Sequence, residues 1–331
     1  MRSFALGLAL VGLVAAATPV AGGGAASARR VAVFYYPWYG TPQVDGEWRH
    51  WQQGDASPPL LIASDYYPAR GVYSSADERI VRAQMGEIAA AGIDEVVTSW
   101  WGRGSPEDER LALVSRLARA RRLTVSVHLE PYGKRTAASS AADLRYLQSL
   151  GIRSAYVYDA ERISAADWSA ALAPLRGLRL FAHTRLVGWA KRAGFDGVYT
   201  YTSAQPDDFA RLCKQARALR LLCAPSVSPG FDARRAVGTA TVRSRRDGRT
   251  YDAQWRAAMC ASPSVVTIAS YNEWHEGTQI EPATSTPPGA RGTYRTYAGA
   301  YQLQGRRAQR AYLTRTAYWA KRFRAGSSCP R

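Results

Sequence analysis

Four ionisable side chains crowd nine residues of the segment SYNEWHEGTQIEPA, residues 270–283: Glu273, His275, Glu276 and Glu281. Glu273 and Glu276 are three positions apart. This spacing brings two side chains within about 5 to 6 Å on a helical turn, but sends them to opposite faces of a strand. The two carboxyl groups can therefore meet only if the apolar strand before them ends ahead of Glu273.

Two neighbouring carboxyl groups repel each other when both are ionised, so one keeps its proton near neutral pH while the other stays charged. One residue type thus supplies both the acid and the base that cleavage of a glycosidic bond requires. Retaining glycosidases hold such a pair about 5 to 5.5 Å apart. We therefore take Glu273 and Glu276 as the candidate catalytic pair. Glu281 lies beyond the turn, and we expect it to support the loop.

Other chemistries find less support in the sequence. The four histidines, His50, His128, His183 and His275, form no HExxH or HxH pattern, so we expect no metal and no other cofactor. The sequence also lacks a GxSxG nucleophile turn and a GxxxxGK[ST] phosphate loop.

Aromatic and acidic residues gather at the ends of other apolar runs. FYYPWYG supplies Tyr36 and Trp38, TSWWG supplies Trp100, and HLEPYG supplies Glu130. Aromatic faces suit the C–H faces of sugar rings, and the polar tips of tyrosine and tryptophan can bond hydroxyl groups. We expect some of these rings to contact a sugar and the others to fill the mouth of the fold.

Short apolar runs, most of them followed by a helical pattern, position these residues. The predicted strands are residues 31–36, 95–100, 123–130, 154–158, 178–183, 197–201, 221–225 and 264–270. Eight such units fit a single-domain (β/α)8 TIM barrel over residues 29–331 better than an open doubly wound sheet. The long loops at 37–72, 226–250 and 271–293 would then emerge at the C-terminal face of the barrel, where active sites of this fold lie.

The first 28 residues have the pattern of a secretory signal peptide, with Arg2, an apolar stretch and a small-residue cleavage site that ends at Ala28. No apolar run in the sequence reaches the roughly 20 residues that a membrane-spanning helix needs. We expect a secreted monomer without stable membrane insertion. Four cysteines allow two disulfides in three connectivities, of which we favour Cys213 with Cys223 and Cys260 with Cys329.

The formal net charge is +18, and 40 of the 44 basic residues are arginine. Such a charge is compatible with a nucleic-acid or acidic-polymer partner. The near absence of lysine and the presence of a single asparagine, Asn272, instead indicate the codon bias of a G+C-rich genome. We therefore expect no nucleic-acid partner, and keep polyanion binding as an alternative.

Together, these residues resemble glycoside hydrolase family 99, the family of endo-α-mannosidases and endo-α-1,2-mannanases. The motifs that carry the resemblance span about residues 31–283 and are FYYPWYG, PQVDGEWRHW, YYPARGVYSSAD, SWW, HLEPY, GFDGVYTY and NEWHEGTQIE. The resemblance implies a secreted or lumenal (β/α)8 barrel without a metal. It also implies retaining cleavage of internal α-mannosidic linkages in α-mannan or mannose-rich glycans.

The resemblance further implies roles for single residues. Glu276 would be the general acid/base, and Glu273 would draw the proton from the mannose 2-hydroxyl, so that a 1,2-anhydro sugar forms. General glycosidase chemistry offers direct nucleophilic attack by Glu273 as the alternative. The expected substrate-binding residues are Tyr36, Trp38, Trp100, Glu130, Tyr201, Asn272 and His275, with Tyr199 as a competitor for Tyr201. Asn272 and His275 would either contact the glycan or brace the site.

Two other functions remain open from the sequence. A barrel of this kind without catalytic activity would serve as a carbohydrate-binding module, and it would bind a glycan without releasing product. A hydrolase with the same carboxyl pair could also act on a different α-glycan, because the motifs do not specify the linkage.

Overall fold

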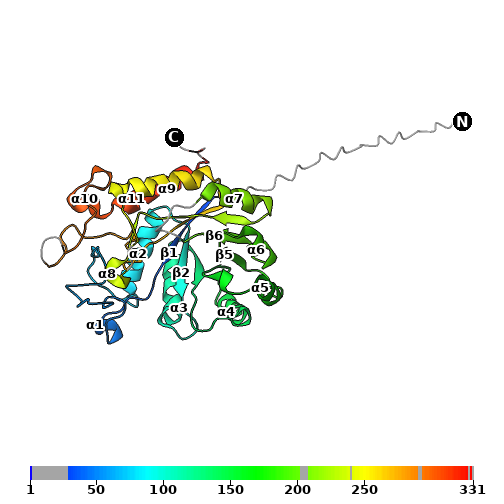
Figure 1. The fold of residues 1–331 in the computed structure, drawn as a ribbon, viewed down its shortest axis with the longest axis horizontal. Helices are drawn as coiled ribbons and strands as arrows, with labels where there is room; N and C mark the ends of the chain where they lie inside the picture. The colour runs from blue at the N-terminus through cyan, green and yellow to red at the C-terminus, as the bar shows by residue number, and fades with distance from the viewer. Residues whose placement is uncertain (2–28, 202–207, 239–240, 290–292, 327–328, 330–331) are drawn as a thin grey trace.

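A parallel sheet forms the centre of the protein (Figure 1). The computed structural model describes Met1 and residues 29–201, 208–238, 241–289, 293–326 and 329, so the predicted signal peptide after Met1 lies outside the described residues. The sheet follows the order β7-β6-β5-β4-β3-β2-β1-β11-β8. Its strands are β1 (Arg30–Tyr35), β2 (Glu95–Trp100), β3 (Thr124–Leu129), β4 (Ser154–Val157), β5 (Arg179–His183), β6 (Gly197–Tyr199), β7 (Leu222–Ala224), β8 (Ser226–Val227) and β11 (Val265–Ile268).

The sheet closes into a barrel where β7 and β8 meet β11. Pro225 separates β7 from β8, because proline has no N–H group to continue a ladder. Its carbonyl still accepts a hydrogen bond from the Thr267 amide at 3.0 Å, and the Cys223 carbonyl accepts one from the Ser264 amide at 3.1 Å. The seventh predicted strand is thus present in two pieces, and the predicted TIM barrel is confirmed.

The strands are buried on both faces, as expected for a parallel barrel covered by helices. One buried cluster fills the barrel interior and includes Phe34, Val97, Tyr156 and Phe181. A second cluster lies between the strands and the surrounding helices. Because neighbouring side chains on a strand point to opposite faces, most strands contribute to both clusters.

Helices follow the strands around the barrel (Figure 1). They are α2 (Glu78–Ala90), α3 (Pro106–Arg119), α4 (Ala137–Ser149), α5 (Ala165–Leu172), α6 (Val187–Arg192), α7 (Phe209–Ala218), α9 (Arg249–Cys260) and α11 (Ala311–Arg324). Helix α3 shows why they form where they do. The Ser105 side chain accepts a hydrogen bond from the Asp108 amide, Pro106 takes the first helical position, and acidic residues occupy the first turn.

Short elements sit in the loops at the C-terminal ends of the strands. They are α1 (Pro42–Asp45), the hairpin of β9 (Phe231–Asp232) and β10 (Val242–Arg243), and α8 (Arg234–Val237). Three single turns of 3₁₀ helix lie at Ala160–Arg162, Arg246–Gly248 and Ala300–Gln302, and α10 (Gly305–Gln309) leads into α11. The hairpin is important for the site, because β9 packs against the turn that follows β11.

Two disulfides join Cys213 to Cys223 and Cys260 to Cys329, which confirms the predicted pairing. The first ties α7 to β7, and the second ties the end of α9 to the C-terminus. Among the described helices, none is long and apolar enough to cross a bilayer.

Helices α9 and α11 pack side by side through a polar contact in an aromatic setting. The Asp252 carboxylate accepts hydrogen bonds from Arg315 at 2.6 and 2.7 Å and from the Trp319 indole at 2.7 Å. The rings of Trp255 and Trp319 stack beside it with their centroids 6.4 Å apart. The acceptor is thus shared by two donors that have little access to water.

Replacement of Asp252 by alanine is expected to lower the free energy of unfolding by about 2 to 3 kcal/mol, because it leaves the buried indole and the guanidinium unpaired. Urea denaturation measures this loss. The control is Glu47→Ala, which removes an exposed ion pair with Arg49 and should change stability by about 0.5 kcal/mol or less. Equal effects of both substitutions would contradict the assigned role of Asp252.

Candidate active site

The chain turns sharply after β11. The Tyr271 amide still pairs with the Phe34 carbonyl of β1 at 2.8 Å, so the strand direction is kept up to that residue. The chain then leaves the strand and returns to Ser270. The Ser270 amide donates to the Thr278 carbonyl at 3.1 Å, and the Ile280 amide donates to the Ser270 carbonyl at 2.9 Å. We call residues 272–280 the catalytic turn, since this closed loop carries both Glu273 and Glu276 at the C-terminal face of the barrel.

Asn272 fastens this turn to β1. Its Oδ1 accepts from the Tyr36 amide at 2.8 Å, and its Nδ2 donates to the Tyr36 carbonyl at 2.9 Å and to the Tyr73 hydroxyl at 3.3 Å. The Tyr39 hydroxyl adds a bond to the Asn272 carbonyl at 3.0 Å. Asn272 is fully buried, and these contacts occupy its amide. Of the two roles expected for Asn272, these contacts favour the bracing one, and its contact with a substrate stays a prediction.

Glu273 and Glu276 are the least satisfied carboxyl groups of the site. Within the described part of the chain, Glu273 Oε1 and Glu276 Oε2 are buried and have no hydrogen-bond partner. Burial raises the pKa of Glu276 to about 7, and the charge of Glu130 adds to this rise. Burial also holds the pKa of Glu273 well above its usual range, with the charges of Glu276 and Glu130 contributing. Burial thus raises the pKa of both carboxyl groups of the turn.

Glu130 is the third carboxylate of the site and follows β3. Its Oε1 accepts a hydrogen bond from the Ser99 hydroxyl at 2.8 Å and lies 2.9 Å from His128 Nδ1. His128 Nε2 in turn lies 2.8 Å from the Tyr199 hydroxyl. Glu130 thus has partners that the free oxygens of Glu273 and Glu276 lack, and it lies close enough to both residues to raise their pKa values.

Tyrosines line the space between these carboxylates. The hydroxyl groups of Tyr36 and Tyr201 are hydrogen-bonded to each other, which joins β1 to β6 across the barrel mouth. The Tyr201 ring also stacks on His128, with the centroids 5.5 Å apart. Tyr199 lies two residues earlier in the chain than Tyr201 and is fully buried. Of these two competing tyrosines, Tyr201 is therefore nearer to the solvent side of the site.

A stack of three rings forms another wall. Trp38 lies on His50 with their centroids 4.4 Å apart and an angle of 9° between the planes, and His50 lies 5.8 Å from His275. His275 Nε2 is 2.5 Å from the His50 carbonyl, so this nitrogen carries the proton, and Nδ1 lies 3.7 Å from Glu273 Oε1. Burial lowers the pKa of His275 to about 4, so the ring is neutral near pH 7.

The structure places Trp100 outside the site. Its side chain is fully buried in the layer between barrel and helices, and its Nε1 donates to Asp108 of α3 at 2.8 Å. The strand alternation explains this, because Val97 and Ser99 point to the interior and Trp100 therefore points away. The expected sugar contact is thus corrected. Trp101, the next residue, is 38 % exposed and donates to the Ser99 hydroxyl at 3.1 Å.

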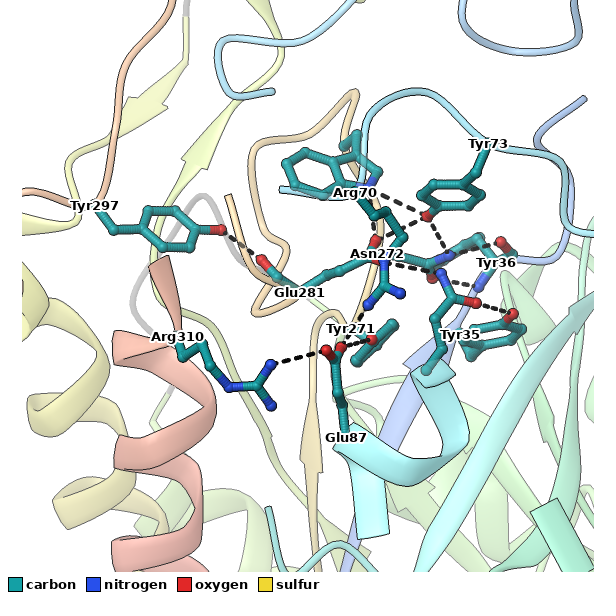
Figure 2. Close-up of polar contacts among 12 residues, drawn as sticks. Tyr35, Tyr36, Arg70, Tyr73, Glu87, Tyr271, Asn272, Glu281, Tyr297 and Arg310 are labelled. Atoms are coloured by element: carbon teal, nitrogen blue, oxygen red, sulfur yellow. Dashed lines mark hydrogen bonds and ion pairs between the residues drawn. The ribbon is translucent and has the colours of Figure 1, made fainter. Parts of the chain in front are cut away.

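Glu281 anchors the far end of the segment from below (Figure 2). It is fully buried, accepts three hydrogen bonds of 2.8 to 2.9 Å from Tyr73, Gln84 and Trp274, and forms an ion pair with Arg70 at 2.9 Å. Burial raises its pKa, but the positive charge of Arg70 opposes the rise. The expected supporting role is confirmed. Sequence reasoning did not assign roles to Arg70 and Tyr73, although both lie in the motif YYPARGVYSSAD.

The same anchor continues to the outer helices. Figure 2 shows Glu87 of α2 between Arg70, Arg310 and Tyr271. Its carboxylate lies 2.7 Å from Arg70, 2.9 Å from Arg310 and 2.6 Å from the Tyr271 hydroxyl. The chain before the catalytic turn is thus connected through Tyr271 to α2 and to the start of α11.

Two cavities lie near the barrel mouth. One of about 990 Å³ is lined by residues of α6 and α7 and includes neither Glu273 nor Glu276 in its lining. A cavity of about 390 Å³ lies closer, lined in part by His183, Tyr199 and Asp159. The described residues form no group of three or more His, Cys, Asp and Glu side chains arranged to hold a metal ion.

Comparison with known proteins places this chain in a family. The family model described as "Glycosyl hydrolase family 99" matches residues 27–325. The "Glycoprotein endo-alpha-1,2-mannosidase-like protein" of Danio rerio is 30 % identical over 88 % of this chain and 78 % of its own length. The "Glycoprotein endo-alpha-1,2-mannosidase" of Rattus norvegicus is 29 % identical over 76 % of this chain and 68 % of its own. The solved "GH99 endo-alpha-mannosidase from Bacteroides thetaiotaomicron" matches with a TM-score of 0.80 and 29 % identity, over 90 % of this chain and 98 % of that one.

Replacement of Asn272 by alanine is expected to lower the free energy of unfolding by about 2 to 4 kcal/mol, because the buried amide and carbonyl of Tyr36 lose their partner. Urea denaturation followed by tryptophan fluorescence measures the loss. The matched control is Gln309→Ala, which removes a partly buried amide bonded to Ser285 and should cost about 1 kcal/mol or less. A loss for Asn272→Ala as small as that of the control would contradict the brace.

Proposed function

Because this chain belongs to glycosyl hydrolase family 99, we propose that it is an endo-acting α-mannosidase that cleaves internal linkages of α-mannan or mannose-rich glycans with retention of configuration. Family membership makes it a glycoside hydrolase, an enzyme of O-glycosyl bonds. One observation carries the proposed chemistry: Glu273 and Glu276 share one turn at the C-terminal face of the barrel, each with an unpaired carboxyl oxygen among the described residues. The names of the relatives support α-mannosidic linkages as the substrate.

Glu276 is the proposed general acid/base. With a pKa of about 7, a large share of its side chains carries a proton at neutral pH, and a general acid works best when its pKa lies near the working pH. Its free oxygen would donate the proton to the leaving glycosidic oxygen. It would then take a proton from water in the second step, since a retaining enzyme uses the same residue in both directions.

Glu273 is the proposed partner, and the surroundings support its action as a base. His275 is held neutral with its proton on Nε2, so Nδ1 presents a lone pair toward Glu273 Oε1 at 3.7 Å. A lone pair disfavours the carboxylate and favours the protonated acid. Glu273 can therefore keep a proton taken from the mannose 2-hydroxyl, as the 1,2-anhydro route requires. Direct attack of Glu273 on the anomeric carbon is the competing route.

The sugar contacts follow from the walls of the site. Tyr36 and Tyr201 offer hydroxyl groups beside the carboxyl pair, and Glu130 offers a carboxylate for sugar hydroxyls. Trp38 supplies an aromatic face next to His275. We propose Trp101 as the exposed indole of the site, in place of Trp100.

Secretion is part of the proposal. Two disulfides are typical of oxidising compartments, and the pattern of the first 28 residues is that of a signal peptide. We also propose that the secreted chain acts as a monomer, which size-exclusion chromatography with light scattering tests directly.

Glu273→Gln and Glu276→Gln are each expected to reduce turnover of an α-1,2-linked mannan by about 10² to 10⁴-fold while the fold is kept, because amides neither accept nor donate the transferred proton. Product linkage and anomeric configuration are followed by NMR. The control, Glu109→Gln, changes an exposed carboxyl of α3 and should keep full activity. Full activity of either site variant would overturn the assignment, and cleavage of another α-glycan alone would redirect it.

Activity should also depend on pH in a defined direction. Glu276 is protonated below about pH 7 and loses its proton above it, so kcat is expected to fall by about tenfold per pH unit on the alkaline side. A raised carboxyl pKa also means that stability is lost as pH rises through about 7, so circular dichroism must show a folded protein at each pH.

The titration itself can be observed by ¹³C NMR of a sample labelled at the glutamate carboxyl groups. We expect one resonance to titrate near pH 7 and to disappear in Glu276→Gln. A glutamate spectrum without such a resonance would contradict the role of Glu276 as acid.

A further inference from the structure

Arg245, next to the β9–β10 hairpin, places a guanidinium in the protein interior. The residue is 8 % exposed, and the guanidinium carbon lies 4.7, 4.8 and 4.5 Å from the ring centroids of Tyr66, Tyr297 and Tyr312. No carboxylate of the described residues forms an ion pair with it. Buried cations normally have such a partner, so this one has to be stabilised by other means. Three aromatic faces supply part of that stabilisation.

The polar contacts of Arg245 go to the catalytic turn. Its Nη2 donates to the Gly277 carbonyl at 2.9 Å and to the Gln279 carbonyl at 2.7 Å. These carbonyls lie one and three residues after Glu276. The Tyr297 hydroxyl, from the same aromatic cage, also donates to the Gln279 carbonyl at 3.2 Å. The Arg245 guanidinium and the hydroxyl of a tyrosine packed against it thus bind the same backbone carbonyl.

The hairpin holds the preceding residue as well. The Asp232 amide of β9 donates to the Glu276 carbonyl at 2.8 Å. Gly277 has a φ of +60°, and a Cβ there would lie 3.1 Å from the Asp232 carbonyl. Gly230 is equally close-packed, because a Cβ there would lie 2.8 Å from Arg245 Cγ. Three carbonyls of the turn are therefore bound by a segment more than thirty residues earlier in the chain.

We propose that Arg245 is a positioning residue of the enzyme, which holds the Glu276 carboxyl in place through the carbonyls of Gly277 and Gln279. The inference rests on the proposed function, since the position of Glu276 has consequences only if it transfers a proton. Misplacement of a catalytic group by about 1 Å can cost 10²-fold in rate. Loss of the guanidinium should thus affect turnover more than substrate binding.

Arg235 offers a matched control. Its guanidinium also donates to two carbonyls, of Ser64 and Thr293, and lies 5.1 Å from the ring of Tyr294; unlike that of Arg245, it also lies 3.5 Å from a carboxylate, that of Asp65. It differs in that its contacts hold two outer loops and leave the catalytic turn untouched. Arg235→Met therefore reproduces the loss of a guanidinium from backbone carbonyls and from a tyrosine face without a direct effect on Glu276.

The experiment compares Arg245→Met with Arg235→Met on α-mannan, at a temperature where both are folded. For Arg245→Met we expect kcat to fall by about 10²-fold, a much smaller change in KM and a shifted alkaline limb of the pH profile. Arg235→Met should retain kcat and the pH profile. Wild-type kcat in Arg245→Met, or equal losses in both variants, would overturn the inference.

Two further measurements cover the other outcomes. If Arg245→Met does not fold, Arg245→Lys is used: its shorter side chain should lose at least one carbonyl bond and about tenfold in kcat, and wild-type kcat would overturn the inference. If the wild-type protein cleaves no α-mannan, the proposed function fails. Hydrogen exchange then still tests the positioning, because Arg245→Met should accelerate exchange of the Gly277 and Ile280 amides at least tenfold and Arg235→Met should not.

Discussion

Two like-charged carboxyl groups buried on one short turn set the main constraint on this protein. Each charge loses water at a cost, and each raises the cost of the other. A hydrogen-bond donor placed on Glu273 or Glu276 would lower this cost, but it would also lower the pKa values and occupy the oxygens that have to meet a substrate. Among the described residues, one oxygen of each carboxyl group has no hydrogen-bond partner, and the bonds of Asn272 and Arg245 go to the backbone around the pair.

The hydrogen bonds that hold the turn come from three directions. Asn272 joins the start of the catalytic turn to β1, Arg245 and Asp232 bind its carbonyls from the hairpin, and Glu281 holds Trp274 from below. Each of these contacts uses a buried polar group to hold the turn in place. Such preorganisation is what electrostatic catalysis needs, because the site must not rearrange when charge develops. The surrounding barrel supplies the rigid strand ends from which all three braces act.

Much of the fold could be predicted from the sequence, because buried parallel strands and amphipathic helices have strong local patterns. The predicted strands, the barrel and the disulfide pairing are confirmed. Trp100 was placed wrongly because a side chain's face depends on strand parity, which a one-residue shift reverses. The role of Arg245 could not be predicted at all, since its partners lie more than thirty residues away and are backbone atoms without any signature in the sequence.

The three glutamates of the segment at residues 270–283 differ in their surroundings, and these surroundings set the role of each. Glu281 accepts hydrogen bonds from three donors and forms an ion pair with the cation Arg70, so a positive charge lies next to its carboxylate. Glu276 and Glu273 receive no such cation, and each senses the negative charge of Glu130. An arginine does stand close to the turn, but Arg245 directs its guanidinium to carbonyls and tyrosine rings. A cation that paired with Glu276 would stabilise the carboxylate and remove the acid, so the placement of this charge on the backbone preserves both the geometry and the proton of the site.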